Sequence, residues 1–188
     1  MTYADLIIKN AKQLLNPVVN NSNKSELQFI ENGSVACFRG KIVGVGSTLE
    51  ILDQFKRSDQ CTVIDAEGKV VAPGFVDPHT HPVFIGTREN EFEMRIQGKS
   101  YREIAEAGGG IRYSVRQLRT ASREQLIQHA LPHLDRFIQY GTTTIEAKSG
   151  YGLSLEDEIK SLEVIQKLNR IHPIDLIPTF LGAHEIPD

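Results

Sequence analysis

The stretch that decides the fold reads Val70-Val71-Ala72-Pro73-Gly74-Phe75-Val76-Asp77-Pro78-His79-Thr80-His81. Its apolar run, residues 70–76, predicts a β-strand buried on both faces, as in a parallel sheet. Because side chains alternate between the faces of a strand, His79 and His81 should point to the same side. Two neutral imidazoles there can hold a divalent metal ion, which would acidify a bound water into a nucleophile. The alternative is a chance pair of surface histidines, since this spacing alone is unspecific.

The composition bounds the class of protein. The chain has 188 residues, of which 40% are hydrophobic and 24% charged, as in ordinary globular proteins. A formal net charge of -3 gives no basic footprint for nucleic acid. We find no apolar run long enough to cross a membrane and no secretory signal in residues 1–5. Cys37 and Cys61 are too few for a disulfide framework, so we expect small buried side chains in a cytoplasmic protein.

The first third of the chain predicts a small β domain over residues 1–69. Arg39-Gly40 is typical of a tight hairpin turn, and the Asn-rich segment 16–24 predicts a loop. The expected strands are residues 5–8, 34–38, 41–45 and 61–65.

Residues 70–188 predict alternating strands and helices. The expected strands are residues 70–76, 142–147 and 175–180, and the expected helices are residues 122–140 and 154–170. Ser122 with Gln125 and Ser154 with Asp157 have the spacing of capping boxes. This order implies parallel strands with right-handed crossovers, which leaves a (β/α)₈ barrel or a doubly wound sheet.

Chain length limits how much of such a fold is present. A full barrel needs roughly 250 residues, whereas this segment supplies only three β units. We therefore expect the N-terminal part of a larger protein, or a truncated form of it.

Polar residues follow all three predicted strands of this second segment. His79 and His81 follow the first strand, Lys148 and Tyr151 the second, and His184 the third. Ligands bind at the C-terminal ends of strands in parallel α/β folds, so we expect these side chains to converge. The alternative is that they are ordinary surface loop residues.

The connection after the first of these strands is long, from residue 84 to residue 111. Arg88 is suited to grip a carboxylate with two hydrogen bonds, but a surface ion pair with Glu89 or Glu91 is an equal alternative. The glycines of residues 108–110 permit positive φ or a close backbone approach to a ligand. A long structured loop at a barrel mouth often acts as a lid.

Residues 71–81, after a small β domain, resemble the amidohydrolase superfamily. Longer stretches resemble the cyclic amidases of histidine degradation within it, and the resemblance covers nearly all of the chain from about residue 34. These stretches are residues 86–92, 107–111, 146–153 and 178–184. The resemblance implies an incomplete metal-dependent-hydrolase TIM (β/α)₈ barrel preceded by a small composite β domain.

The resemblance also implies an activity, namely hydrolysis of 4-imidazolone-5-propanoate to N-formimidoyl-L-glutamate with one zinc or iron ion. By position, His79 and His81 match two metal ligands. Arg88, Tyr151 and His184 match substrate-contacting positions, and His184 would donate to the oxyanion or shuttle a proton. The family's remaining ligands, a later His and an Asp, would lie on strands absent from this chain.

Other features stay open. Lys148 follows the wrong strand for a metal-bridging carbamylated lysine, so we expect an ion pair there. Residues 112–114 differ from the small residues that the family pattern has after the glycines. The Asn-rich insertion near Asn20 is also atypical of the family. The sequence decides neither zinc against iron nor whether the protein is a homodimer.

Three hypotheses follow. The first is a cyclic amidase seen in part, the second a related deaminase acting on a cyclic amidine, and the third a non-catalytic truncated form. Catalytic zinc sites usually use three protein ligands, so we expect the 188-residue chain alone to be inactive.

Overall fold

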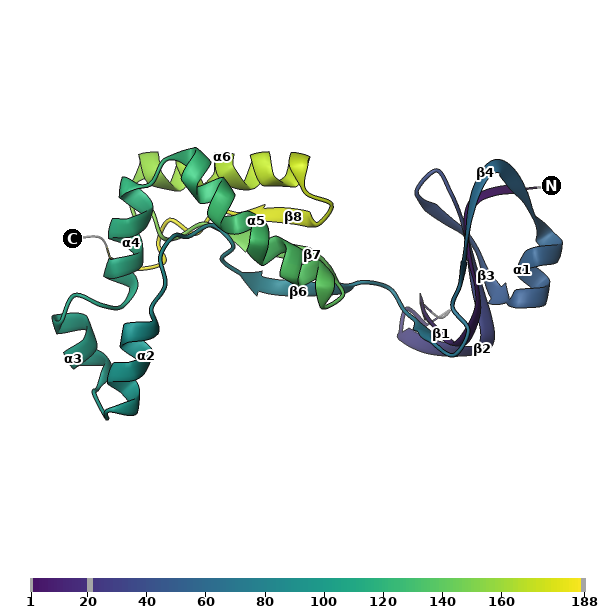
Figure 1. Cartoon of the computed structure of the whole chain (residues 1–188), viewed down its shortest axis with the longest axis horizontal. Helices are drawn as coiled ribbons and strands as arrows, with labels where there is room; N and C mark the ends of the chain where they lie inside the picture. Colours follow the sequence, from purple (N-terminus) through teal and green to yellow (C-terminus); the bar gives the residue numbers. More distant parts are fainter. Residues whose placement is uncertain (1, 20–21, 187–188) are drawn as a thin grey trace. The chain divides into compact units, whose positions relative to one another are not determined.

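The computed structural model describes residues 2–19 and 22–186, and the chain divides into two compact units, Met1–Pro73 and Gly74–Asp188 (Figure 1). Each unit has its own sheet. Asn20 and Asn21, within the predicted Asn-rich loop, lie outside the described residues. No helix among the described residues is long and apolar enough to cross a bilayer.

The first unit is a five-stranded sheet with one short helix. The strand order is β3-β2-β1-β4, and β5 also pairs with β1. The pairs β1–β2 and β2–β3 are antiparallel, whereas β4 and β5 run parallel to β1. The elements are β1 (Thr2–Val19), β2 (Ser25–Phe38), β3 (Lys41–Ser47), α1 (Thr48–Gln54), β4 (Phe55–Asp65) and β5 (Val70–Val71).

The predicted strands of this unit are confirmed, each within a longer strand. The predicted hairpin is confirmed too: Arg39 and Gly40 have φ of 52° and 73°, as two-residue hairpin turns require. The predicted loop over residues 16–24 is wrong in part, because β1 continues to Val19 and pairs with the start of β2. The Asn-rich composition indicated a loop, but backbone hydrogen bonds between β1 and β2 continue as far as Val19 and Ser25.

A small apolar core holds the helix of this unit on its sheet. It consists of Ala4, Ile7, Ala36, Ile51 and Phe55, with Cys61 packed against it. Gly44 lets the Phe55 ring lie against β3, since a Cβ at Gly44 would stand 2.4 Å from that ring. Cys61 and Cys37 are free thiols and only partly buried.

The second unit is an α/β layer of three parallel strands in the order β6-β7-β8. This confirms the predicted fold class, a part of a (β/α) barrel with helical crossovers. The strands are β6 (Phe75–Thr80), β7 (Thr142–Lys148) and β8 (Asp175–Thr179). The helices are α2 (Glu89–Ile96), α3 (Tyr101–Glu106), α4 (Ile111–Thr120), α5 (Arg123–Gln139) and α6 (Leu155–Ile171).

Both long predicted helices are confirmed to within one residue at each end. Ser122 forms a full capping box with Gln125, and the hydroxyl of Ser154 accepts a hydrogen bond from the Asp157 amide at 3.2 Å. Gly141 ends α5 with φ of 86°. The long connection after β6 contains α2 and α3.

The prediction of one strand over residues 70–76, buried on both faces, is wrong. Val70 and Val71 pair with β1 in the first unit, and a new strand starts at Phe75. Pro73 has no N–H for a ladder, and the Gly74 backbone lies so close to Thr143 that a Cβ would meet its hydroxyl oxygen at 2.2 Å. Phe75 and Val76 are 65% and 66% exposed, and neighbouring strand residues point to opposite faces, so β6 is buried on neither face at this point.

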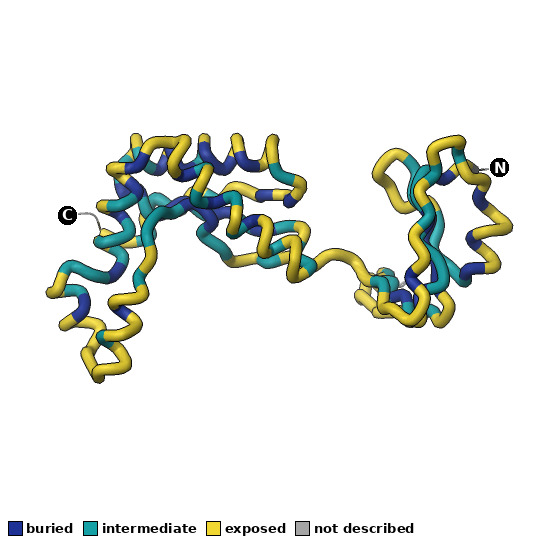
Figure 2. Tube along the Cα trace, viewed as in Figure 1, coloured by how far each residue is buried: buried dark blue, intermediate teal, exposed yellow. Residues whose placement is uncertain are grey.

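The core of the second unit lies between two helices and the sheet face that carries Ile145, Ala147 and Leu176. α5 packs against β7 and α6, and α6 packs against β8. Figure 2 shows buried and exposed residues alternating along both helices, as expected for helices with one face on a sheet. The fully buried members include Leu126, Leu134, Ile145, Ile165, Leu168 and Leu176. This layer fixes the strand ends that carry the predicted site.

Candidate active site

Three aromatic rings from separate strand ends meet in the second unit. His81, which follows β6, stacks on His184, which follows β8, with ring centroids 4.8 Å apart and planes at 12°. Tyr151, which follows β7, lies 5.0 Å from His81 and 5.5 Å from His184. The structure therefore brings together three of the residues that the sequence singled out.

Hydrogen bonds between the strand ends hold this arrangement. The hydroxyl of Thr80 donates to the carbonyl of Glu146 at 2.6 Å, which ties β6 to β7. The Leu181 amide donates to the Ser149 hydroxyl at 3.0 Å, which ties the segment after β8 to the end of β7. Nδ1 of His184 lies 3.0 Å from the carbonyl oxygen of Gly150. The segment that carries His184 is thus fastened to the segment that carries Tyr151.

His79 lies beside this group but is exposed. Its ring centroid is 6.2 Å from that of His81, with the rings nearly perpendicular at 76°. The register of β6 against β7 shifts between Asp77 and Thr80, and the His79 amide donates to the Asp77 carboxylate at 3.1 Å. The two imidazoles are therefore neighbours at an irregular strand end.

The environment of His81 favours a neutral ring. Burial lowers the pKa of His81, and the positive charges that His184, His79 and Lys148 can carry lower it further, against a hydrogen bond to the Ser149 backbone. Nδ1 of His81 is buried and has no hydrogen-bond partner among the described residues. A neutral imidazole with an unused ring nitrogen is the form that binds zinc or iron. His81 thus fits a metal ligand, and His79 is placed to be a second one.

The metal site is incomplete within residues 2–19 and 22–186. In that part of the chain no group of three or more His, Cys, Asp or Glu side chains could hold a metal ion. His79 and His81 are therefore the candidate ligands that lie side by side at this strand end.

Arg88 lies apart from the stacked rings, at the start of α2. It forms an ion pair with Glu91, in which Nε donates to Oε1 at 2.8 Å and Nη2 to Oε2 at 2.5 Å. The hydrogen bond to Glu91 raises the pKa of Arg88, and Tyr151 contributes in the same direction. Burial raises the pKa of Tyr151, against the nearby charge of Arg88. Arg88 and Tyr151 therefore act on one another electrostatically.

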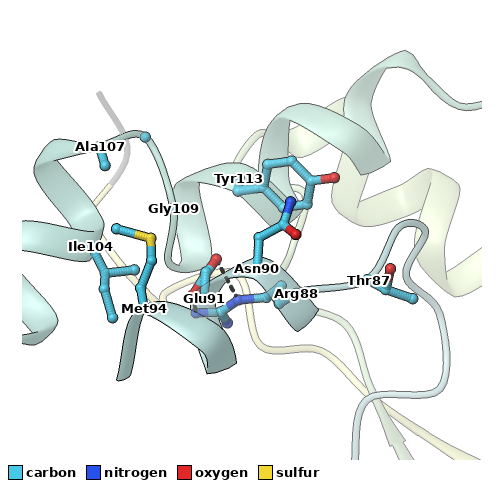
Figure 3. Close-up of a pocket in the computed structure, with 10 residues that line it drawn as sticks. Thr87, Arg88, Asn90, Glu91, Met94, Ile104, Ala107, Gly109 and Tyr113 are labelled. Carbon is cyan, nitrogen blue, oxygen red and sulfur yellow. Dashed lines mark hydrogen bonds and ion pairs between the residues drawn. The ribbon is translucent and has the colours of Figure 1, made fainter. Parts of the chain in front are cut away.

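A pocket of about 190 Å³ lies beside this ion pair. Figure 3 shows Arg88, Glu91, Gly109 and Tyr113 among the residues that line it. Sequence reasoning named Glu91 only as an alternative surface partner of Arg88. The burial of Glu91 could not be predicted, because the polar sequence around it is typical of an exposed segment. Its position three residues after Arg88 on a helix did indicate that the two side chains could pair.

Lys148 forms the predicted ion pair, with Glu146 two residues earlier on the same face of β7. Hydrogen bonds from Lys148 and then Thr179 lower the pKa of Glu146. Lys148 therefore serves as a counterion at the strand end.

Comparisons of sequence place the chain among known proteins. A model described as "Amidohydrolase family" matches residues 62–117. The imidazolonepropionase of Geobacillus sp. (strain WCH70) is 47% identical over 190 residues, covering 97% of this chain and 45% of that protein. The imidazolonepropionase of Haloarcula marismortui is 42% identical, covering 100% of this chain and 44% of that protein. The chain thus spans less than half the length of the curated relatives it matches.

Comparisons of structure show the fold. A 5-methylcytosine deaminase from Klebsiella pneumoniae has a TM-score of 0.58 at 18% identity, covering 92% of this chain and 35% of that chain. Guanine deaminase from E. coli has a TM-score of 0.53 at 19% identity over the same shares. These structural matches show the fold. The sequence matches show that the chain is similar, over nearly its whole length, to part of the imidazolonepropionases, and residues 62–117 match the amidohydrolase family.

Proposed function

We propose that the whole protein containing this chain hydrolyses 4-imidazolone-5-propanoate to N-formimidoyl-L-glutamate with the help of one zinc or iron ion. The observation that carries the proposal is the meeting of His81, Tyr151 and His184 at three parallel strand ends, where amidohydrolase-type barrels bind substrates. The 42–48% identity to imidazolonepropionases supports the choice of substrate. In the reaction, water adds to the ring carbonyl carbon, the ring C–N bond breaks, and the leaving nitrogen receives a proton.

His79 and His81 would hold the metal ion. When bound, such an ion acidifies a water molecule and polarises a carbonyl group. Burial lowers the pKa of His81 and so favours its neutral ring, and with the ring proton on Nε2 the buried Nδ1 has a lone pair to offer.

His184 is the candidate proton carrier. A carbonyl oxygen only accepts hydrogen bonds, so Nδ1 of a neutral His184 must donate to Gly150 across their 3.0 Å contact. This assigns the proton to Nδ1 and leaves Nε2 as a base. Nε2 would take a proton from the attacking water and pass it to the leaving ring nitrogen.

Arg88 and Tyr151 would bind the substrate. A guanidinium group suits the propionate carboxylate, which it can grip with two parallel hydrogen bonds. The raised pKa of Tyr151 keeps its hydroxyl protonated, so that it can donate a hydrogen bond to the ring or the carboxylate.

The proposal also includes a cytoplasmic location and a small-molecule substrate without nucleic-acid or membrane partners, with a homodimer as the assembly to test. The free thiols of Cys37 and Cys61 and the net charge of -3 support the first points. Sedimentation velocity would decide between monomer and homodimer.

The test uses His79→Ala and His81→Ala in the whole protein. Loss of one of the few ligands should cut metal content and reduce turnover by about 100-fold or more. Metal is measured by mass spectrometry and turnover by loss of the imidazolone absorbance. The control is His133→Gln on α5, which should leave the metal in place. An unchanged metal content in both alanine variants would refute the ligand assignment, and ammonia release from cyclic amidines without imidazolone opening would support a deaminase instead.

A further inference from the structure

Two of the three glycines at residues 108–110, Gly109 and Gly110, lie against the carboxylate of Glu91. Glu91 is only 7% exposed, and its Oε1 accepts a hydrogen bond from the Gly110 amide at 2.9 Å. The same carboxylate holds the guanidinium of Arg88 with two bonds. Glu91 therefore joins the glycine turn to the residue proposed to bind substrate (Figure 3).

The turn can close on Glu91 only because it lacks side chains. A Cβ at Gly109 would stand 3.0 Å from Oε1 of Glu91 and 2.9 Å from Cγ2 of Ile104. Gly110 has φ of 73°, which β-carbon-bearing residues adopt only with strain. On the outer side of the turn, Arg116 donates to the Gly108 carbonyl at 2.5 Å. The backbone here is thus shaped around the carboxylate of Glu91.

The ion pair leaves one edge of Arg88 available. A guanidinium has five N–H donors in a fixed plane, and Glu91 takes one on Nε and one on Nη2. Among the described residues Nη1 donates no hydrogen bond. The edge formed by Nη1 and the second Nη2 proton can therefore receive both oxygens of another carboxylate.

We propose that Glu91 is a positioning residue: held by the glycine turn, it fixes the plane of Arg88 so that the opposite guanidinium edge selects ligands carrying a carboxylate. The inference rests on the proposed function for the identity of the ligand. It assigns a role to the glycine turn as the holder of Glu91, rather than as a direct contact of the substrate.

The physical basis is preorganisation. A free arginine side chain loses rotamer freedom when it grips a ligand, whereas a side chain already held by a buried carboxylate loses less. In Glu91→Gln the amide group places a donor against the N–H groups of Arg88, so the guanidinium plane is released. Glu93→Gln removes an exposed carboxylate from the same helix and is the matched control.

The experiment measures binding and turnover separately in the whole protein. Titration calorimetry gives the Kd of imidazole-4-propanoate and of its uncharged propanamide analogue. We expect the wild type and Glu93→Gln to prefer the acid over the amide. Glu91→Gln should weaken binding of the acid about tenfold and leave binding of the amide within about twofold, since preorganisation acts on the carboxylate alone. Gly109→Ala should shift binding in the same direction. With the imidazolone substrate, Glu91→Gln should raise KM more than it changes kcat.

The outcomes separate the two proposals. Equal weakening of acid and amide in Glu91→Gln would indicate a merely structural role and overturn the inference, as would an unchanged preference or no preference in the wild type. A wild type that binds the acid through Glu91 but never opens the imidazolone ring would overturn the proposed function and leave the positioning role in place.

Discussion

Lys160 on α6 offers the sharpest test of how the second unit is held together. Its side chain is buried, with 8% of the residue exposed. Nζ donates to the carbonyls of Leu118, Arg119 and Ala121 at 3.0, 3.1 and 3.3 Å, at the C-terminal end of α4. It also lies 2.8 Å from Oδ1 of Asp157. One ammonium group therefore closes the end of α4 and fastens it to α6.

Lys160→Met keeps the apolar stem and removes the charge. A hydrogen bond from a charged donor is worth about 1.5–3 kcal/mol, and three buried or partly buried carbonyls would lose theirs. The values do not add, because the three bonds share one donor group and the variant is relieved of burying a charge. We therefore expect the free energy of unfolding of the second unit to fall by about 2–4 kcal/mol, roughly a 30- to 1000-fold change in its folding equilibrium.

The assay must resolve the second unit, because a chain of two compact units need not unfold in one step. Native-state hydrogen exchange of buried amides in β7 and α6 reports that unit alone. Lys167→Met, at an exposed position of the same helix, is the matched control and should change stability by less than about 0.5 kcal/mol. If the buried amides of Lys160→Met are as well protected from hydrogen exchange as those of the control, Lys160 does not stabilise the end of α4.

Three further predictions follow from buried groups. Burial, and then the charges of His129 and Arg136, lower the pKa of His133, so the unfolded chain binds a proton more readily. Stability should therefore be lost as pH falls below about 6.5, and denaturant titrations at pH 8 and 5.5 should show a smaller loss in His133→Gln. Glu158→Ala should lower stability by about 2–4 kcal/mol, because two amides lose their acceptor, and Glu158→Gln by less; equal losses in urea melts would contradict this. The 188-residue chain with added zinc or iron should not open imidazolone propanoate, and measurable turnover would overturn that expectation.

Periodicity and caps were enough to predict α5 and α6, whereas α2, α3 and α4 were not predicted. In α5 and α6 the apolar face and the capping serine agree with one another, so local signals and packing lead to the same element. The run at residues 70–76 failed because apolar composition cannot distinguish one strand from two short ones in different sheets. The strand is interrupted at Pro73 and Gly74. The sequence predicted a bend at these residues, but a bend does not show that the chain passes from one sheet to another.

The candidate site was predictable as far as topology reaches. Parallel strands end on one edge of a sheet, so His81, Tyr151 and His184 could be expected together without any distances. The ion pair of Arg88 with Glu91 was one of the alternatives open from the sequence, and the structure confirms it. The burial of Glu91 was not predictable, because it depends on a turn of three glycines seventeen to nineteen residues later in the chain. Long connections decide such contacts, and no local pattern encodes them.

His81 has a buried ring nitrogen without a hydrogen-bond partner among the described residues. A buried nitrogen without a partner is unfavourable, and a hydrogen bond from a polar group would relieve this cost. Instead the ring is surrounded by His184, Tyr151 and His79, which leave Nδ1 unbonded and make a charged ring unfavourable. An unpartnered nitrogen alone does not identify a metal ligand, because Nε2 of His129 on α5 is also buried without a partner among the described residues. The free Nδ1 of His81 supports the proposed metal site only in combination with the neighbouring ring of His79 at the same strand end.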